Sequence, residues 1–144
     1  MTKVRKVRKR KQEGVIELTA WTDEELNKIG AAEELRIASL RADGTLRNPT
    51  TIWVVRIDDE LYVRSVNGRT AAWFRGVQTR LQGYIRAGGV NKEVTFVEET
   101  DPAANDRIDA AYAAKYHRYA ASIISDINGS EARTATIKLV PRQL

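Results

Sequence analysis

Arginine, hydroxyl and indole side chains gather in three short stretches of this chain. The stretches are Arg47-Asn48-Pro49-Thr50-Thr51-Ile52-Trp53, Arg64-Ser65-Val66-Asn67-Gly68-Arg69 and Trp73-Phe74-Arg75. Guanidinium groups are forked donors that match phosphate oxygens, hydroxyl groups supply shorter donors, and aromatic rings stack on flat ring systems. Together these residue types fit a site for a phosphate-bearing ligand with a planar ring. The plainer alternative is that the tryptophans belong to the core and the arginines to solvated strand edges.

A hairpin would bring the first two stretches together. Residues 51–57 and 61–66 are rich in β-branched and aromatic residues, and the acidic residues 58–60 join them at hairpin length. The start of the first strand and the end of the second lie at the same end of such a hairpin. The polar residues expected to meet there are Arg47, Asn48, Thr50, Ser65, Asn67 and Gly68. A helix predicted from Thr70 starts beside them, and its first-turn N–H groups favour an anion.

Hydrophobic spacing and turn residues predict the other elements. The expected elements are a helix at 22–30, strands at 35–41, 51–57 and 61–66, a helix at 70–87, a strand at 93–97, a helix at about 104–127 and a strand at 134–140. Their order is α-β-β-β-α-β-α-β. Short antiparallel strands with inserted helices favour an α+β fold with a small barrel or a strongly curled sheet.

The chain lacks the residues on which most familiar catalytic sites depend. It has no cysteine and one histidine, His117, among 144 residues. Disulfides, thiolate catalysis and multi-histidine metal sites are therefore excluded, and no metal site is predicted. Neither a Gly-x-Gly-x-x-Gly motif nor a phosphate-loop lysine motif occurs. No stretch approaches the roughly 20 apolar residues of a membrane-spanning helix, and we expect a cytoplasmic protein.

Positive charge is concentrated at the N-terminus. Residues 1–12 hold seven Lys and Arg residues and no acidic one, so the rest of the chain carries 17 basic and 19 acidic side chains. This charge density predicts a disordered basic arm at residues 1–13, followed by a single domain at 14–144. The arm is either a weak, salt-dependent nucleic-acid contact through residues 3–11 or a solubilising extension.

Lys115 and Tyr116 form a second candidate site on the long helix. A lysine beside a tyrosine could contact a substrate anion or donate a proton. The plainer interpretation is that Tyr112 and Tyr116 pack one helical turn apart while Lys115 extends to solvent or to a salt bridge.

Residues 21–142 resemble the bacterial family DUF2255, whose sequence blocks occur here in the same order. After an acidic helix start, the blocks read Asp43-Gly44, Arg47-Asn48-Pro49-Thr50-Thr51-Ile52-Trp53-Val54-Val55, Leu61-Tyr62-Val63-Arg64-Ser65-Val66-Asn67-Gly68, Trp73-Phe74-Arg75, Ala111-Tyr112-Ala113-Ala114-Lys115-Tyr116 and Thr136-Ile137-Lys138-Leu139-Val140-Pro141-Arg142.

This resemblance implies a split barrel, because DUF2255 is similar to flavin-binding split-barrel proteins such as pyridoxamine-phosphate oxidases and deazaflavin-dependent nitroreductases. It implies a homodimer that binds FMN or the deazaflavin F420 between subunits. The positions that fall on cofactor positions of the deazaflavin enzymes are Arg47, Asn48, Pro49, Ser65, Gly68, Trp73 and Arg75, to which the residue chemistry adds Thr50, Trp53 and Arg64.

The expected roles follow from the side chains. Arginine and hydroxyl groups anchor a phosphate or a ribityl chain, Trp53 and Trp73 border the ring, and Gly68 permits close backbone approach. The expected function is redox chemistry on a small molecule by a flavin or deazaflavin. The alternative is a non-catalytic module that binds a small ligand, or nucleic acid through the basic arm.

Overall fold

The structure is a computed structural model that describes residues 20–142, so the predicted arm at 1–13 lies outside the described residues. The strands are β1 (Leu35–Ser39), β2 (Thr50–Ile52), β3 (Val55–Ile57), β4 (Glu60–Arg64), β5 (Gln82–Ala87), β6 (Val90–Glu98) and β7 (Thr136–Pro141). The helices are α1 (Asp23–Ala31), α2 (Ala72–Thr79), α3 (Pro102–Lys115), α4 (Ala121–Ile127) and α5 (Ser130–Arg133), with a 3-10 turn, η1, at Gly68–Thr70. None of these helices has the length and apolar character that crossing a bilayer requires.

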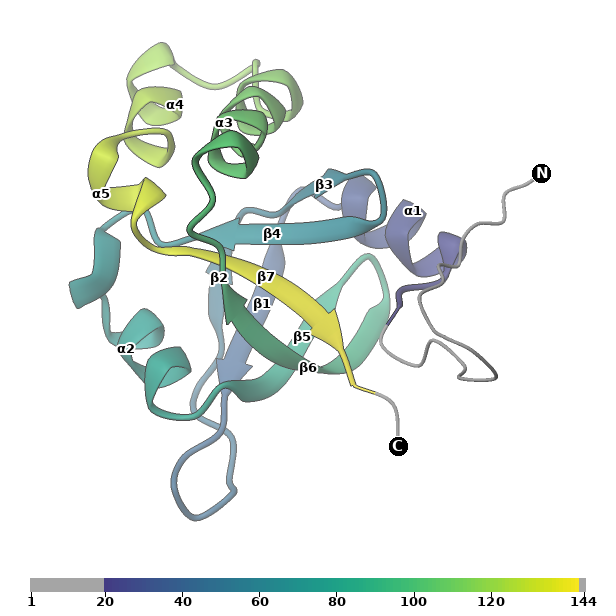
Figure 1. Ribbon diagram of the computed structural model, residues 1–144. Coiled ribbons are helices and arrows are strands. Elements are labelled where there is room, and N and C mark those ends of the chain that lie inside the picture. Colours follow the sequence, from purple (N-terminus) through teal and green to yellow (C-terminus); the bar gives the residue numbers. More distant parts are fainter. Residues whose placement is uncertain (1–19, 143–144) are drawn as a thin grey trace.

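The seven strands form one antiparallel sheet in the order β2-β1-β5-β6-β7-β4-β3. Only residues 53–54 separate β2 from β3 in sequence, yet these two strands are the opposite edges of the sheet. The sheet must therefore curl until its edges approach one another, and Figure 1 shows this curl. The predicted α+β class with a small, curled antiparallel sheet is confirmed.

Apolar side chains fill the inside of the curled sheet, and helices close it. β5 alternates strictly between buried and more exposed positions, with Ile85 buried and Tyr84 exposed. α1 begins at the predicted capping box of Thr22 and Glu25. The residues that α1 and α2 bury in this core are Leu26, Ile29, Phe74 and Val77. α3 packs on β3 and covers a second cluster, made of Val55, Tyr62, Ile108, Tyr112, Tyr116 and Ile127.

The predicted strand at 51–57 is two strands. Thr50–Ile52 pairs with β1, whereas Val55–Ile57 pairs with β4. Side chains of α3 hold the crossing point between them: the Tyr116 hydroxyl accepts from Val54 N at 3.2 Å, and Lys115 Nζ donates to Val54 O at 2.7 Å. β-branched residues suit both strands equally, so local sequence does not mark the break.

The predicted helix at 70–87 ends early, at Thr79, and its second half is β5. Leu81, which lies at helical spacing from Trp73 and Val77, is 48% exposed. Gly83 explains why a strand forms: a Cβ there would lie 2.1 Å from Ala38 O on β1, so only glycine allows this close strand approach. Gly88 and Gly89, which follow the predicted helix, form the β5–β6 turn, with φ of 58° and 84°.

The predicted helix at 104–127 is also divided. α3 ends at Lys115, and α4 starts at Ala121 in a new direction (Figure 1). The break lets Tyr119 turn back toward Trp53, where the two rings meet edge to face at 4.8 Å. Edge-to-face contact between these two half-buried rings stabilises the new direction of the chain.

Candidate functional site

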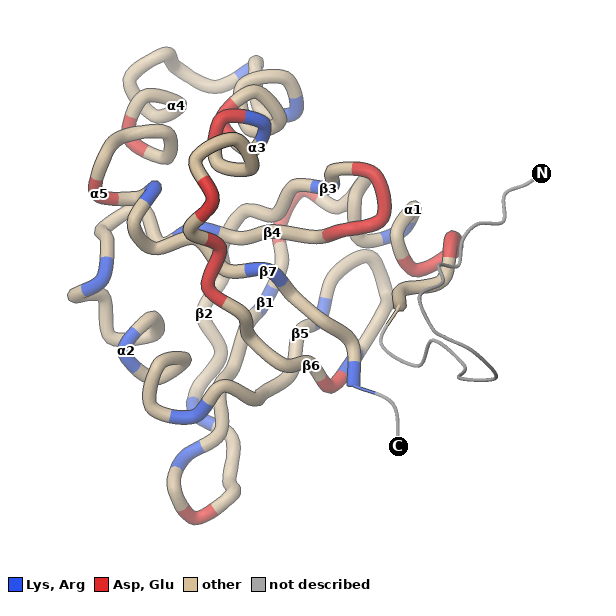
Figure 2. The backbone as a smooth tube through the Cα atoms, viewed as in Figure 1, with Lys and Arg blue, Asp and Glu red and all other residues tan. Residues whose placement is uncertain are grey.

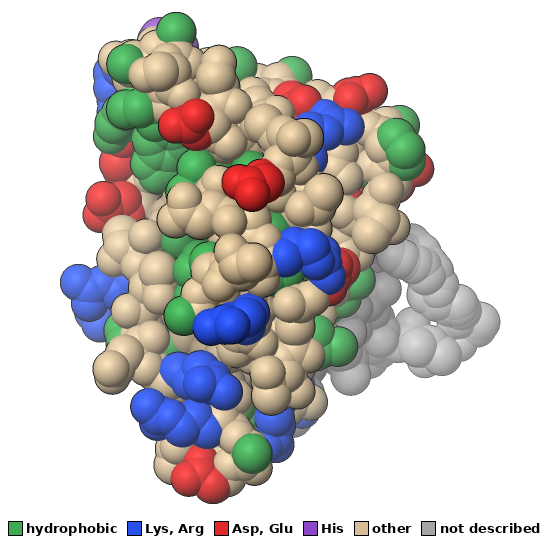
Figure 3. Space-filling model, turned by 90° about the vertical axis from the view of Figure 1, so that its left-hand side faces the viewer, with side chains coloured by type: hydrophobic (Ala, Val, Ile, Leu, Met, Phe, Trp, Pro, Cys, Tyr) green, Lys and Arg blue, Asp and Glu red, His purple; other side chains and the backbone are tan. Residues whose placement is uncertain are grey.

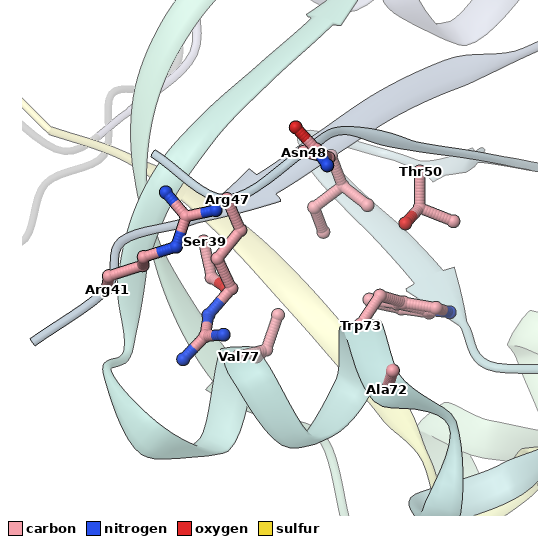
Figure 4. A pocket seen from close by; sticks show the side chains of 9 residues that line it. Ser39, Arg41, Arg47, Asn48, Thr50, Ala72, Trp73 and Val77 are labelled. Carbon is pink, nitrogen blue, oxygen red and sulfur yellow. The ribbon is translucent and has the colours of Figure 1, made fainter. Parts of the chain in front are cut away.

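A polar cavity of about 260 Å³ lies between the end of β1, the start of β2 and the first turns of α2. Its lining residues are Ile37, Ser39, Arg41, Arg47, Asn48, Thr50, Ala72, Trp73 and Val77. Figure 4 shows the Arg41 and Arg47 guanidinium groups at one end and the Trp73 ring at the other. The cavity therefore has a cationic end and an aromatic end.

Arg47 is held in this cavity by its backbone and by α2. Its N–H donates to Ser39 O at 2.9 Å. Its side chain lies so close to Gly76 that a Cβ there would come within 3.0 Å of Arg47 Cδ and Nε. Arg47 Nε is buried and has no partner among the described residues. A buried donor without a partner is costly, which marks Arg47 as a residue whose position needs an explanation.

A second, mainly apolar cavity of about 350 Å³ adjoins the first and shares Thr50 and Trp73 with it. Its other lining residues are Thr51, Ile52, Trp53, Arg64, Ser65, Val66, Asn67, Ala71, Ile123 and Ile127. Ser65 is 1% exposed, and its Oγ has no hydrogen-bond partner in the described chain. Beside it, α2 begins without a side-chain cap. Ser65 and Ala71, the residue before α2, thus line the same cavity.

Charge is distributed unevenly around the two cavities. Figure 2 shows basic residues along α2 and in the loop between β1 and β2, where Asp43 is the acidic exception. The Asp43 carboxylate accepts hydrogen bonds from the N–H and the hydroxyl of Thr45. In the space-filling view, arginine and lysine side chains gather in the lower half of this face and hydrophobic ones above them (Figure 3). The polar cavity is therefore suited to an anion.

Arg64 lines the apolar cavity, but its guanidinium group points into the protein. Its Nε donates to Thr136 Oγ1 at 2.9 Å, and Nη2 donates to Asn105 Oδ1 at 2.8 Å. Nη1 donates to Asp109 Oδ1 at 2.6 Å and to Asn128 Oδ1 at 3.0 Å. With all three nitrogens engaged and the side chain 0% exposed, Arg64 joins β4 to α3 and β7.

Five other predicted site residues line neither cavity: Pro49, Gly68, Arg75, Lys115 and Tyr116. Gly68 has φ of 80° and packs against Glu131, so it shapes the turn before α2. Arg75 is exposed on α2. Lys115 and Tyr116 hold Val54 at the crossing between β2 and β3. The predicted residues that do line the cavities are Arg47, Asn48, Thr50, Trp53, Arg64, Ser65 and Trp73.

Sequence reasoning missed several lining residues. Ser39 is the last residue of β1, and Arg41 follows it by two positions. Gly76 is the signal that could have found them, because its lack of a side chain leaves room for Ser39 and Arg47. Ile123 and Ile127 come from α4, whose separate direction depends on the unpredicted break after α3.

Lys115 makes folding depend on pH. Burial lowers the pKa of Lys115 from 10.5 to about 8. The unfolded chain therefore binds more protons between these two values, and the free energy of unfolding rises with pH across that window. In Lys115→Met this contribution is absent. Urea unfolding of both proteins at about pH 8 and about pH 10 should show the wild type gaining stability relative to the variant. A constant or falling difference would contradict the shift.

The curled sheet of antiparallel strands is shared with known structures and defines the class of the protein, a split barrel. An F420 reductase has a TM-score of 0.55 at 12% identity, with 83% of this chain and 93% of that chain covered. The heme storage protein HutZ of Vibrio cholerae has a TM-score of 0.63 at 14% identity, covering 85% and 91%. A conserved hypothetical protein, Rv2991 of Mycobacterium tuberculosis, has a TM-score of 0.64 at 14% identity, covering 92% and 86%.

Within this class, the chain belongs to DUF2255, described as uncharacterized proteins conserved in bacteria. The family model matches residues 25–139, which confirms the predicted resemblance. No curated protein matches the chain in sequence.

Proposed function

We propose that this protein binds a phosphate-bearing ligand of the flavin type, FMN or F420, across the two adjoining cavities. The phosphate lies at the arginine end, near Arg41 and Arg47, and the planar ring lies between Trp53 and Trp73. One observation carries this proposal: each cavity is lined by a residue with a buried donor that has no partner among the described residues, Arg47 with its Nε in one and Ser65 with its Oγ in the other. Two such donors fit a ligand that is polar at one end and planar at the other.

The lining residues bind and orient the ligand. Within residues 20–142, no Asp, Glu, His, Lys or Tyr lines either cavity. When bound, a flavin-type ring supplies hydride or one-electron chemistry by itself. Asn48 and Thr50 contact the chain that joins ring and phosphate, and the isoleucines of the apolar cavity exclude water from the ring. We leave Arg64, Gly68 and Arg75 out of the ligand contacts, because the first is fully engaged and the others lie outside the cavities.

The proposal includes a homodimer, as the resemblance implies, with a second copy covering the exposed mouth of the cavities. Leu46 and Val66 are next in sequence to Arg47 and Ser65, which line the cavities. They are 44% and 45% exposed and offer apolar surface to such a partner. The same absence of acid–base groups also fits the alternative function, a non-catalytic protein that stores or senses the ligand. Turnover of bound ligand with a reductant separates these two functions.

Thermal unfolding with added ligands tests the proposal. At a ligand concentration 100 times the dissociation constant, the stability of the fold should rise by about 2.7 kcal/mol. We expect this rise with FMN or F420 and not with heme, since the one histidine, His117, lines neither cavity. Stabilisation by heme alone, or by none of these compounds, would contradict the proposed function.

A further inference from the structure

Aromatic rings form a continuous stack from the apolar cavity toward the surface. Trp53 lines the cavity. The Tyr116 ring lies on its indole with centroids 3.8 Å apart and planes 3° from parallel. Tyr119 contacts the same indole edge to face, with centroids 4.8 Å apart. The binding of a flat ligand explains why Trp53 is at the cavity, but it does not explain the two phenols behind it.

The two phenols differ in what can accept their protons. The Tyr116 hydroxyl donates to the backbone carbonyls of Glu33 and Val54, which are not bases. The Tyr119 hydroxyl donates to the Glu33 carboxylate, which also accepts from Arg118 at 3.0 Å. The hydrogen bond from Tyr119 lowers the pKa of Glu33, and the carboxylate in turn raises the pKa of Tyr119. Only Tyr119 therefore has a base in contact with its phenolic proton within this stack.

We propose that Trp53, Tyr116 and Tyr119 form a redox relay that carries single-electron oxidation from the apolar cavity to the protein surface. An oxidant in the cavity takes one electron from the Trp53 indole. Tyr119 then returns one electron to Trp53 while its phenolic proton moves to the Glu33 carboxylate. In sum the oxidant gains one electron, Tyr119 loses one electron and one proton, and Glu33 holds the proton.

The ring contacts support each step of this relay. Electron transfer between rings in van der Waals contact is fast. The Tyr116 ring, stacked on the Trp53 indole, enlarges the aromatic system that holds the positive charge after Trp53 is oxidised. The Tyr119 phenol is oxidised more readily than the Trp53 indole when the phenolic proton leaves at the same time. The oxidised state therefore moves from Trp53 outward to Tyr119. The oxidant rests on the proposed function: it is an isoalloxazine ring excited by light. The relay itself is a property of the chain and can be tested with another oxidant.

Pulse radiolysis with the azide radical, which oxidises tryptophan, tests the relay without any flavin. We expect tryptophan radical absorbance to decay while tyrosine radical absorbance rises, at a rate independent of protein concentration. Tyr119→Phe keeps the ring and removes the proton, so this rise should be lost. Trp53→Phe should reduce the rise of tyrosine radical absorbance to the background from the other two tryptophans. Glu33→Gln should slow this rise. Tyr84→Phe is the matched control, because Tyr84 is exposed on β5, outside the stack, and the rise should be unchanged.

Equal tyrosine radical formation in Tyr119→Phe and in wild type would overturn the relay, provided that both proteins show the same unfolding curve. A second arm uses light with FMN, whose binding is measured first. If FMN fails to bind and the azide experiment shows outward transfer, the proposed function fails and the relay stands. If FMN binds and neither oxidant produces the Tyr119 radical, the relay fails and the proposed function stands.

Discussion

Replacing Arg64 with methionine is expected to lower the free energy of unfolding by about 3–5 kcal/mol. Methionine preserves much of the apolar stem but removes every donor. Thr136 and Asn105, both buried, then lose the guanidinium that binds them, and Asp109 keeps Arg133 as its remaining basic partner. Thr136 Oγ1 still donates to Asn105 Oδ1, but the buried carbonyls of Asn105 and Ile127 lose the guanidinium donor. Hydrogen bonds from a charged donor contribute more than neutral ones, and several are lost together. Urea unfolding measures this loss.

Arg107→Met is the matched control for this substitution. Arg107 also forms an ion pair, with Asp58 at 2.9 Å, but both side chains are largely exposed, at 61% and 81%. An exposed pair of this kind contributes at most about 1 kcal/mol. If the two variants lost similar stability, Arg64 would not be the buried anchor that its contacts indicate.

Elements of the fold could be predicted from the sequence where their residue types were distinctive. The capped start of α1 and the last strand follow from local patterns and form within two residues of the predicted bounds, whereas the predicted hairpin forms only between residues 55–57 and 60–64. The split between β2 and β3 could not be predicted from local sequence, because its cause is non-local. Lys115 and Tyr116, some sixty residues away, bind Val54 and keep it out of the pairing between strands. The strand β5 was missed because Trp73, Val77, Leu81 and Ile85 happen to repeat at helical spacing.

The sequence indicated more of the cavity lining than of the path of the chain that builds it. Arg47 and Trp73 line one cavity, and Ser65 and Trp73 line the adjoining one, while the role of these residues in binding a ligand stays a prediction. Arg64 shows the limit of such reasoning. An arginine ending a strand beside polar residues suits a ligand site, and sequence does not show that α3 and β7 present Asn105, Asp109 and Thr136 to it.

Arg47→Met is expected to weaken FMN binding by about 1.5–3 kcal/mol, roughly 10- to 150-fold, because it removes charge-assisted hydrogen bonds to the phosphate. Arg75→Met provides the matched control. Sequence reasoning placed both arginines at the phosphate, whereas only Arg47 lines a cavity. FMN affinity should therefore hardly change in Arg75→Met. If FMN affinity fell equally in both variants, the phosphate would bind at the exposed face of α2 and not in the cavity.

The measurement that tests the central claim most directly compares FMN with riboflavin, which has the same ring and no phosphate, by calorimetric titration of wild type and Arg47→Met. The same comparison applies to F420 and its phosphate-free deazariboflavin. We expect the phosphate to strengthen binding to the wild type, and the Arg47→Met substitution to remove most of that advantage while leaving riboflavin affinity unchanged. If each flavin bound no better than its phosphate-free counterpart, or if the advantage survived in Arg47→Met, the phosphate would not lie at this cavity.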